Sequence, residues 1–200
     1  PASTPGFELG AAINNSLANQ FQIVARMISA HPKLGVKRQV FFVSLAGFDT
    51  HDRQNKRHAE LLAQLDQAFQ YFDQTIRNLG LGQQVTTFTA SDFGRTFTSN
   101  GDGTDHGWGG HHFVMGGAVN GGEIRGAFPA YASKSRTDNE FPDSPDMLSN
   151  GSLLPALSVQ SYGATLGQWV GLSPAQLTDV FPLLDRMDPN TQLKYLFRSV

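Results

Sequence analysis

Residues 38–46 read RQVFFVSLA, and residues 84–90 read QVTTFTA. The first stretch is a continuous run rich in β-branched and aromatic residues, which is typical of a strand covered on both faces. Between the two stretches, apolar residues recur at three- and four-residue steps from about Gln54 to Leu79, which predicts a long amphipathic helix. The order strand, helix, strand predicts a right-handed crossover that places the two strands parallel and adjacent.

Further elements flank this crossover. Apolar residues follow the same helical spacing from Leu9 to Ile28, which predicts a helix there. A short strand is expected at 113–119. Helices are expected at 157–171 and after Ser173, which suits an N-cap because a proline follows it. This alternation of strands and helices predicts an α/β fold with a mainly parallel sheet.

Bulk composition narrows the class of protein. The chain has 200 residues, which suits a single domain over 1–200. Its net charge is −2 and its pI is about 6.3, so it lacks the basic character of a nucleic-acid-binding protein. No apolar run reaches the roughly 18–20 residues of a transmembrane segment. The chain has no cysteine, which excludes disulfides and thiolate metal sites.

Both predicted strands end in polar clusters. The first runs into GFDTH at 47–51, and the second runs into SDFGR at 91–95. In open parallel sheets, ligands bind beyond the carboxyl ends of the strands. Asp49 and His51 together offer oxygen and imidazole donors, which suit Zn, Mn or Fe-type ions. The alternative is that Asp49 caps the following helix and His51 is solvated.

The second cluster offers a carboxylate and a guanidinium. Asp92 is a candidate metal ligand, and its alternative is an Asx residue that closes a turn. Arg95 is a candidate for bidentate binding of an anionic oxygen group. Its alternative is a simple ion pair with Asp92.

A glycine-rich stretch follows at 101–126 and contains ten of the 21 glycines. Asp105-His106 lies within it, either as two ligands or as one ligand with a residue that orients it. His111-His112 precedes a predicted strand, so at most one of these two side chains faces any given site. The candidate metal ligands at one edge of the sheet are therefore Asp49, His51, Asp92, Asp105 and His106. The competing reading is a set of ordinary polar surface loops.

Four segments of the chain resemble the DUF1501 family of bacterial proteins. They are AGFDTHDRQ (46–54), LLAQLDQAFQYF (61–72), TASDFGRTFTSNGDGTDHGWGGHHFVMGGAVNGG (89–122) and ATLGQWVG (164–171). Members of that family typically carry the signature GGFDTH … SEFGR … N … GTDHG … GGAV.GG. The resemblance runs in matching order from about residue 40 to 182, with Asp92 in place of the usual Glu.

The family is generally grouped with the alkaline phosphatase and sulfatase superfamily. This resemblance implies a three-layer α/β/α fold and one or two divalent metals, Zn, Mn or Ca, beside an anionic ester substrate steadied by Arg95. By the superfamily's pattern, Asp49 and His51 supply the first pair of ligands, Asp92 the next carboxylate, and His106 the last imidazole. Phe93 stands where that pattern has a histidine, so the ligand set of a second metal site is incomplete.

The resemblance also implies that a part of the protein lies outside this chain. The superfamily takes its nucleophile from an N-terminal strand, and no candidate strand precedes residue 38. We therefore expect a C-terminal portion of a longer protein, whose sheet is completed by an N-terminal segment or a partner chain. The leading functional expectation is a metal-dependent hydrolase of phosphate or sulfate esters, or a fragment of one. The alternative is a non-catalytic exported binding or assembly protein. Family members are often exported, which implies a periplasmic or extracellular location.

Overall fold

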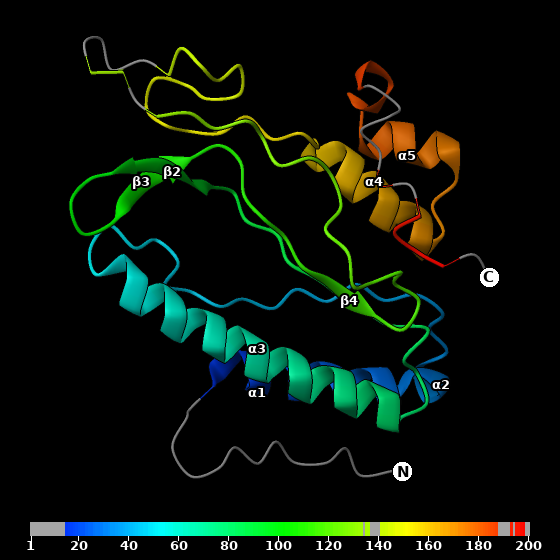
Figure 1. Ribbon diagram of the computed structural model, residues 1–200. Coiled ribbons are helices and arrows are strands. Elements are labelled where there is room, and N and C mark those ends of the chain that lie inside the picture. Colours follow the sequence, from blue (N-terminus) through cyan, green and yellow to red (C-terminus); the bar gives the residue numbers. More distant parts are fainter. Residues whose placement is uncertain (1–14, 134, 137–140, 188–192, 194, 199–200) are drawn as a thin grey trace. The chain divides into compact units, whose positions relative to one another are not determined.

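The computed structural model describes residues 15–133, 135–136, 141–187, 193 and 195–198 (Figure 1). The chain divides into two compact units. The first comprises Pro1–Thr87 with Met115–Gly117, and the second comprises Phe88–Val114 with Ala118–Val200.

The first unit is built on three helices, α1 (Ser16–Ser29), α2 (His31–Leu34) and α3 (Gln54–Asn78). Asn15 caps α1, because its side-chain oxygen accepts a hydrogen bond from the backbone N–H of Ala18 at 3.1 Å. The predicted helix over 54–79 is confirmed by α3. The predicted helix over 9–28 is confirmed from Ser16 onward, and its first turns lie outside the described residues.

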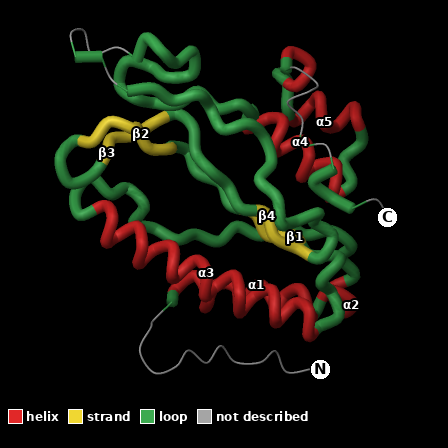
Figure 2. Tube along the Cα trace, in the orientation of Figure 1, coloured by secondary structure: helices red, strands yellow, loops and turns green. Residues whose placement is uncertain are grey.

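The core of the first unit lies between α1 and α3, which run alongside each other (Figures 1 and 2). Phe21 of α1 and Phe72 of α3 are both buried, and their rings stack with centroids 4.4 Å apart. Apolar side chains from the segment before α3 pack against this core, namely Phe41, Val43 and Leu45.

The prediction of a doubly covered strand at 38–46 is wrong. Phe41, Val43 and Leu45 face the core, whereas Val40 and Phe42 are 79% and 92% exposed. Side chains therefore alternate as in a strand, but the described residues form no β-ladder here. The apolar run specifies an extended chain with a buried face. No described strand pairs with its backbone, but the Gln20 side-chain amide of α1 accepts from the Ser44 N–H at 2.9 Å and donates to the Ser44 carbonyl at 2.8 Å.

The predicted mainly parallel sheet, and with it the three-layer α/β/α fold, is also wrong. The described residues form two antiparallel two-stranded sheets, which pair β1 (Thr86–Phe88) with β4 (Val114–Gly116) and β2 (Gly94–Ser99) with β3 (Thr104–Gly107). The two strands of the predicted crossover are therefore not a parallel pair.

A tight turn joins β2 to β3. The Asn100 N–H donates to the Gly103 carbonyl at 3.0 Å, and Gly101 has φ of 121°. The chain therefore reverses after β2 and forms a hairpin. In the sequence, the hairpin lies between β1 and β4, which pair with each other.

The second unit ends in helices α4 (Val159–Val170) and α5 (Pro174–Val180), followed by the 3₁₀ turn η1 (Leu184–Arg186). The predicted N-cap of α5 is confirmed, because Ser173 forms a reciprocal capping box with Gln176. A Cβ at Gly163 of α4 would lie 2.6 Å from the ring of Phe181, so this glycine permits close packing. Among the described helices, none has both the length and the apolar character needed to cross a membrane.

Candidate metal centre

Asp49 and His51 lie on the loop that leads into α3 in the first unit. Gly47 begins this loop with φ of 106°, and Arg53 ends it with φ of 47°, which is an uncommon conformation for a residue with a side chain. Thr50, between the two candidate ligands, is only 2% exposed. Because neighbouring side chains point in different directions, burial of Thr50 turns Asp49 and His51 outward.

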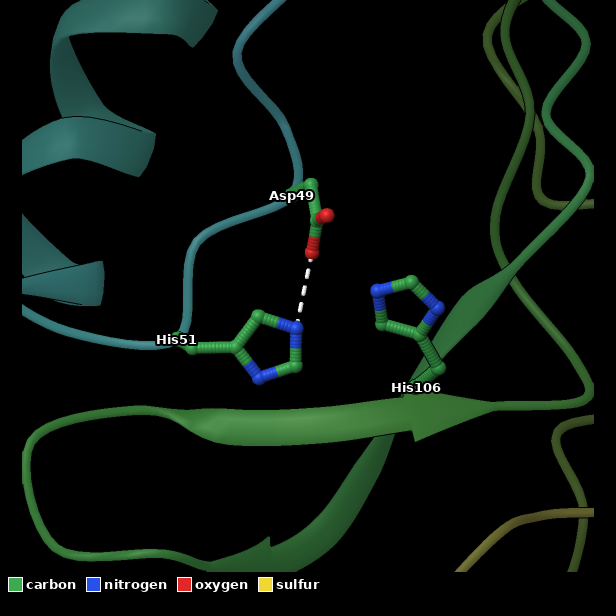
Figure 3. Close-up of side chains that lie close together, drawn as sticks. All are labelled: Asp49, His51 and His106. Atoms are coloured by element: carbon green, nitrogen blue, oxygen red, sulfur yellow. Dashed lines mark ion pairs between the residues drawn. The ribbon is translucent and has the colours of Figure 1, made fainter.

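The side chains of Asp49 and His51 meet each other. The Nε2 of His51 lies 2.8 Å from Oδ1 of Asp49 (Figure 3). The His51 side chain is 47% exposed and the Asp49 side chain is 61% exposed. The alternative role for Asp49, as the cap of the following helix, is wrong, because the N-cap of α3 is Arg53 and no side chain caps it. The pair is suited either to two metal ligands or to an aspartate that orients a histidine.

His106 lies on β3 of the second unit, where it is exposed (Figure 3). The β2–β3 register places Arg95 directly opposite His106. The ring of Phe93 stacks on the His106 imidazole with centroids 4.2 Å apart and planes 7° from parallel. The Arg95 guanidinium lies 5.2 Å from the centroid of the Phe93 ring and donates to the Thr104 carbonyl at 3.0 Å. Three side chains of different chemistry therefore gather on one face of this hairpin.

The two remaining predicted carboxylates have other surroundings within the second unit. Asp105 accepts a hydrogen bond from the Asn100 side-chain amide at 3.1 Å. As the strand neighbour of His106, it faces the opposite side of the ladder. Asp92 is exposed in the turn before β2. That turn is bridged by Ser91, whose hydroxyl donates to the Phe93 carbonyl at 2.9 Å.

Asp49 and His51 offer one carboxylate and one imidazole from the first unit, and both donor types suit a Zn or Mn ion. The structure brings Asp49 and His51 together. The contribution of His106, which belongs to the other unit, stays a prediction from the sequence.

The sequence did not single out the surroundings of the paired histidines in the second unit. His111 stacks on Phe128 with centroids 5.5 Å apart, and His112 stacks on Tyr162 with centroids 5.6 Å apart. The expectation that the two side chains face different ways is thus confirmed. The Tyr162 hydroxyl donates to the Thr89 carbonyl at 3.1 Å.

Burial shifts the pKa values of two groups in this cluster, His112 and Tyr162. Desolvation, with a smaller contribution from the positive charge of His111, lowers the pKa of His112. Desolvation raises the pKa of Tyr162 to about 12. Both rings are therefore held in their neutral forms at neutral pH.

Comparison with known proteins identifies a family but no close relative. No curated protein and no solved structure matches the chain. A family model described as "Protein of unknown function (DUF1501)" matches residues 9–181. This match includes the Asp49–His51 loop, the β2–β3 hairpin and α4. The chain therefore belongs to the DUF1501 family.

Proposed function

We propose that this protein binds a divalent Zn or Mn ion through Asp49 and His51 and acts as a metal-dependent hydrolase of phosphate or sulfate esters. The observation that carries the proposal is the 2.8 Å approach of the Asp49 carboxylate to the His51 imidazole on an exposed loop. Because the Asp49 oxygen and the His51 nitrogen are already close together, the two side chains need little rearrangement to bind the same ion.

The donor types favour Zn or Mn over Ca. Calcium takes six to eight oxygen ligands, and imidazole nitrogen is a poor substitute for them. Zinc and manganese accept mixed nitrogen and oxygen ligands. His51 therefore argues against the calcium option that the family resemblance left open.

His106 is the third ligand in this proposal, on the strength of the GFDTH and GTDHG signature segments. Arg95 would bind the anionic group of the ester. Its Nη1 is anchored to the Thr104 carbonyl, which fixes one arm of the guanidinium. The ion would supply Lewis-acid polarisation of the ester. The choice of ester substrate rests on the implied kinship with phosphatases and sulfatases.

A second candidate function is a non-catalytic binding or assembly protein that is exported to the periplasm or cell surface. Exposed apolar side chains favour it, because exposed apolar patches mark interaction sites. Val40 and Phe42 are exposed in the first unit, and Phe97, Phe128 and Tyr131 form an exposed ring cluster in the second. In that function, an N-terminal segment or a partner chain would cover the segment 38–46.

Calorimetric titration with Zn and Mn separates these functions. Asp49→Asn keeps the shape of the side chain and removes its charge, so it should lower metal affinity at least about 10-fold. Asp52→Asn is the matched control on the same loop. Asp52 pairs with Arg57 at 2.8 Å, and this exposed ion pair contributes little to stability.

Hydrolysis of 4-nitrophenyl phosphate and 4-nitrophenyl sulfate, with and without added metal, completes the test. Metal binding with metal-dependent hydrolysis supports the hydrolase. Metal binding without hydrolysis of either ester supports the binding protein. Equal metal affinities for the Asp49→Asn and Asp52→Asn variants would refute the proposed metal site.

A further inference from the structure

Phe93 and His106 are held face to face by the geometry of the β2–β3 hairpin. Phe93 directly precedes β2, and the Arg95 guanidinium lies 5.2 Å from the centroid of its ring, so the two side chains lie on the same side of the chain. Arg95 is directly opposite His106 in the ladder, so all three side chains share one face. On this face, the Phe93 ring stacks nearly parallel on the His106 imidazole.

Close backbone packing fixes the position from which the Phe93 ring projects. Gly94, the next residue, lies so close to Gly109 that a Cβ at Gly94 would be 1.6 Å from the Gly109 carbonyl oxygen. On the other side, Ser91 donates to the Phe93 carbonyl. The Phe93 backbone therefore has little freedom to shift.

We propose that Phe93 is a positioning residue that fixes the ring plane of His106. The terminal torsion of a histidine is broad, so a flat neighbouring ring can select among its orientations. A flat aromatic ring 4.2 Å away restricts rotation about that torsion, because only the parallel orientation keeps the contact. The Arg95 guanidinium near the Phe93 ring adds a cation–π contact that holds Phe93 in turn.

This inference rests on the proposed function for its chemical meaning. A metal ligand must present its nitrogen lone pair in the plane of the imidazole, so a fixed plane lowers the entropy lost on binding. The superfamily pattern has a histidine where this chain has Phe93. In this chain, the aromatic residue at that position supports a ligand instead of being one.

Nuclear magnetic resonance of the His106 ring protons tests the stack without any metal. Stacking on Phe93 should displace these resonances upfield from those of a solvated histidine. Phe93→Leu should abolish the displacement, and Phe93→Tyr should preserve it. Phe97→Leu makes the same chemical change within β2, but Phe97 contacts Phe128 and Tyr131 instead, so it should leave the His106 resonances in place. Unchanged His106 resonances in Phe93→Leu would overturn the inference, provided that the Phe97→Leu spectrum shows a folded protein.

Titration with Zn or Mn tests the consequence for binding. Phe93→Leu should weaken metal affinity about 2- to 10-fold, with recovery in Phe93→Tyr and no loss in Phe97→Leu. A Phe93→Leu variant that loses the upfield displacement but keeps full affinity, while His106→Gln lowers affinity, would overturn the positioning role. If the unsubstituted protein binds neither metal, the proposed function fails, and the resonance displacement alone then decides whether Phe93 fixes the ring of His106.

Discussion

Substitution of Gly94 by alanine should open the β2–β3 hairpin. The new methyl group would lie 1.6 Å from the Gly109 carbonyl oxygen and 2.5 Å from its carbonyl carbon. An ordinary carbon–oxygen contact is about 3.3 Å. The two backbones must therefore separate by roughly 1.7 Å, and neither can yield as a flexible side chain would.

The expected loss of stability for Gly94→Ala is about 3 kcal/mol or more. Forcing an extra carbon into a packed site costs about 1–3 kcal/mol, and backbone on both sides puts this site at the upper end. Each hairpin hydrogen bond broken by the separation adds about 1 kcal/mol. Because the second unit is expected to unfold cooperatively, the urea midpoint should fall without a large change in slope.

Tryptophan fluorescence during urea unfolding is the appropriate assay. Both tryptophans of the chain, Trp108 and Trp169, belong to the second unit, so the signal reports the unit that carries the substitution. Gly110→Ala is the matched control, because a Cβ there would meet nothing closer than 3.8 Å and its φ is not positive. A Gly94→Ala midpoint equal to that of Gly110→Ala would refute the close approach of Gly94 to Gly109.

Three further substitutions test other parts of the structure. Phe72→Ala removes a side chain that is 3% exposed and stacked on Phe21, so it should destabilise the first unit by about 3–5 kcal/mol, measured by circular dichroism in urea. Ser173→Ala removes the capping box of α5 and should lower stability by about 1 kcal/mol, measured as a shift in thermal midpoint against a more conservative Ser173→Thr control. The lowered pKa of His112 means that the unfolded chain binds the proton more readily, so stability is complete above about pH 6.5 and falls as the pH drops below that value. His112→Gln should flatten this part of the melting-temperature profile between pH 5 and 7, whereas His111→Gln should not remove the decline. An unchanged decline in His112→Gln would assign it to other groups.

Local signals in the sequence predicted the helices well. The apolar stripe of α3 and the Ser-Pro start of α5 each depend on residues that are close to one another in the sequence, within a few helical turns. The prediction of the sheet was wrong for the opposite reason, because strand pairing depends on residues that are far apart in the sequence. The apolar run at 38–46 specifies an extended chain with a buried face, but its residues do not specify which strand would pair with its backbone. The turn at Asn100–Gly103 joins β2 to β3, but in the sequence it is indistinguishable from the rest of the glycine-rich stretch at 101–126.

The candidate site could also be predicted only in part from the sequence. Asp49 and His51 are two residues apart, so their approach could be predicted from sequence spacing alone. The stack of Phe93 on His106 depends on the register that places Arg95 opposite His106, which is a property of the paired strands. Glycine spacing was the available signal, because Gly94 and Gly107 face each other in the ladder and admit only hydrogen at those points.

The exposed face of the segment 38–46 has a consequence for how this protein behaves in concentrated solution. Val40 and Phe42 project from an extended stretch whose backbone pairs with no described strand, and such an edge is a template for association with another chain. Repulsion between molecules opposes that association, but a net charge of −2 supplies little of it, and none remains near the pI of about 6.3. Colloidal stability should therefore depend steeply on buffer pH. Phe42→Glu removes the exposed ring and adds one negative charge, so it should improve solubility without disturbing the helices that cover the other face.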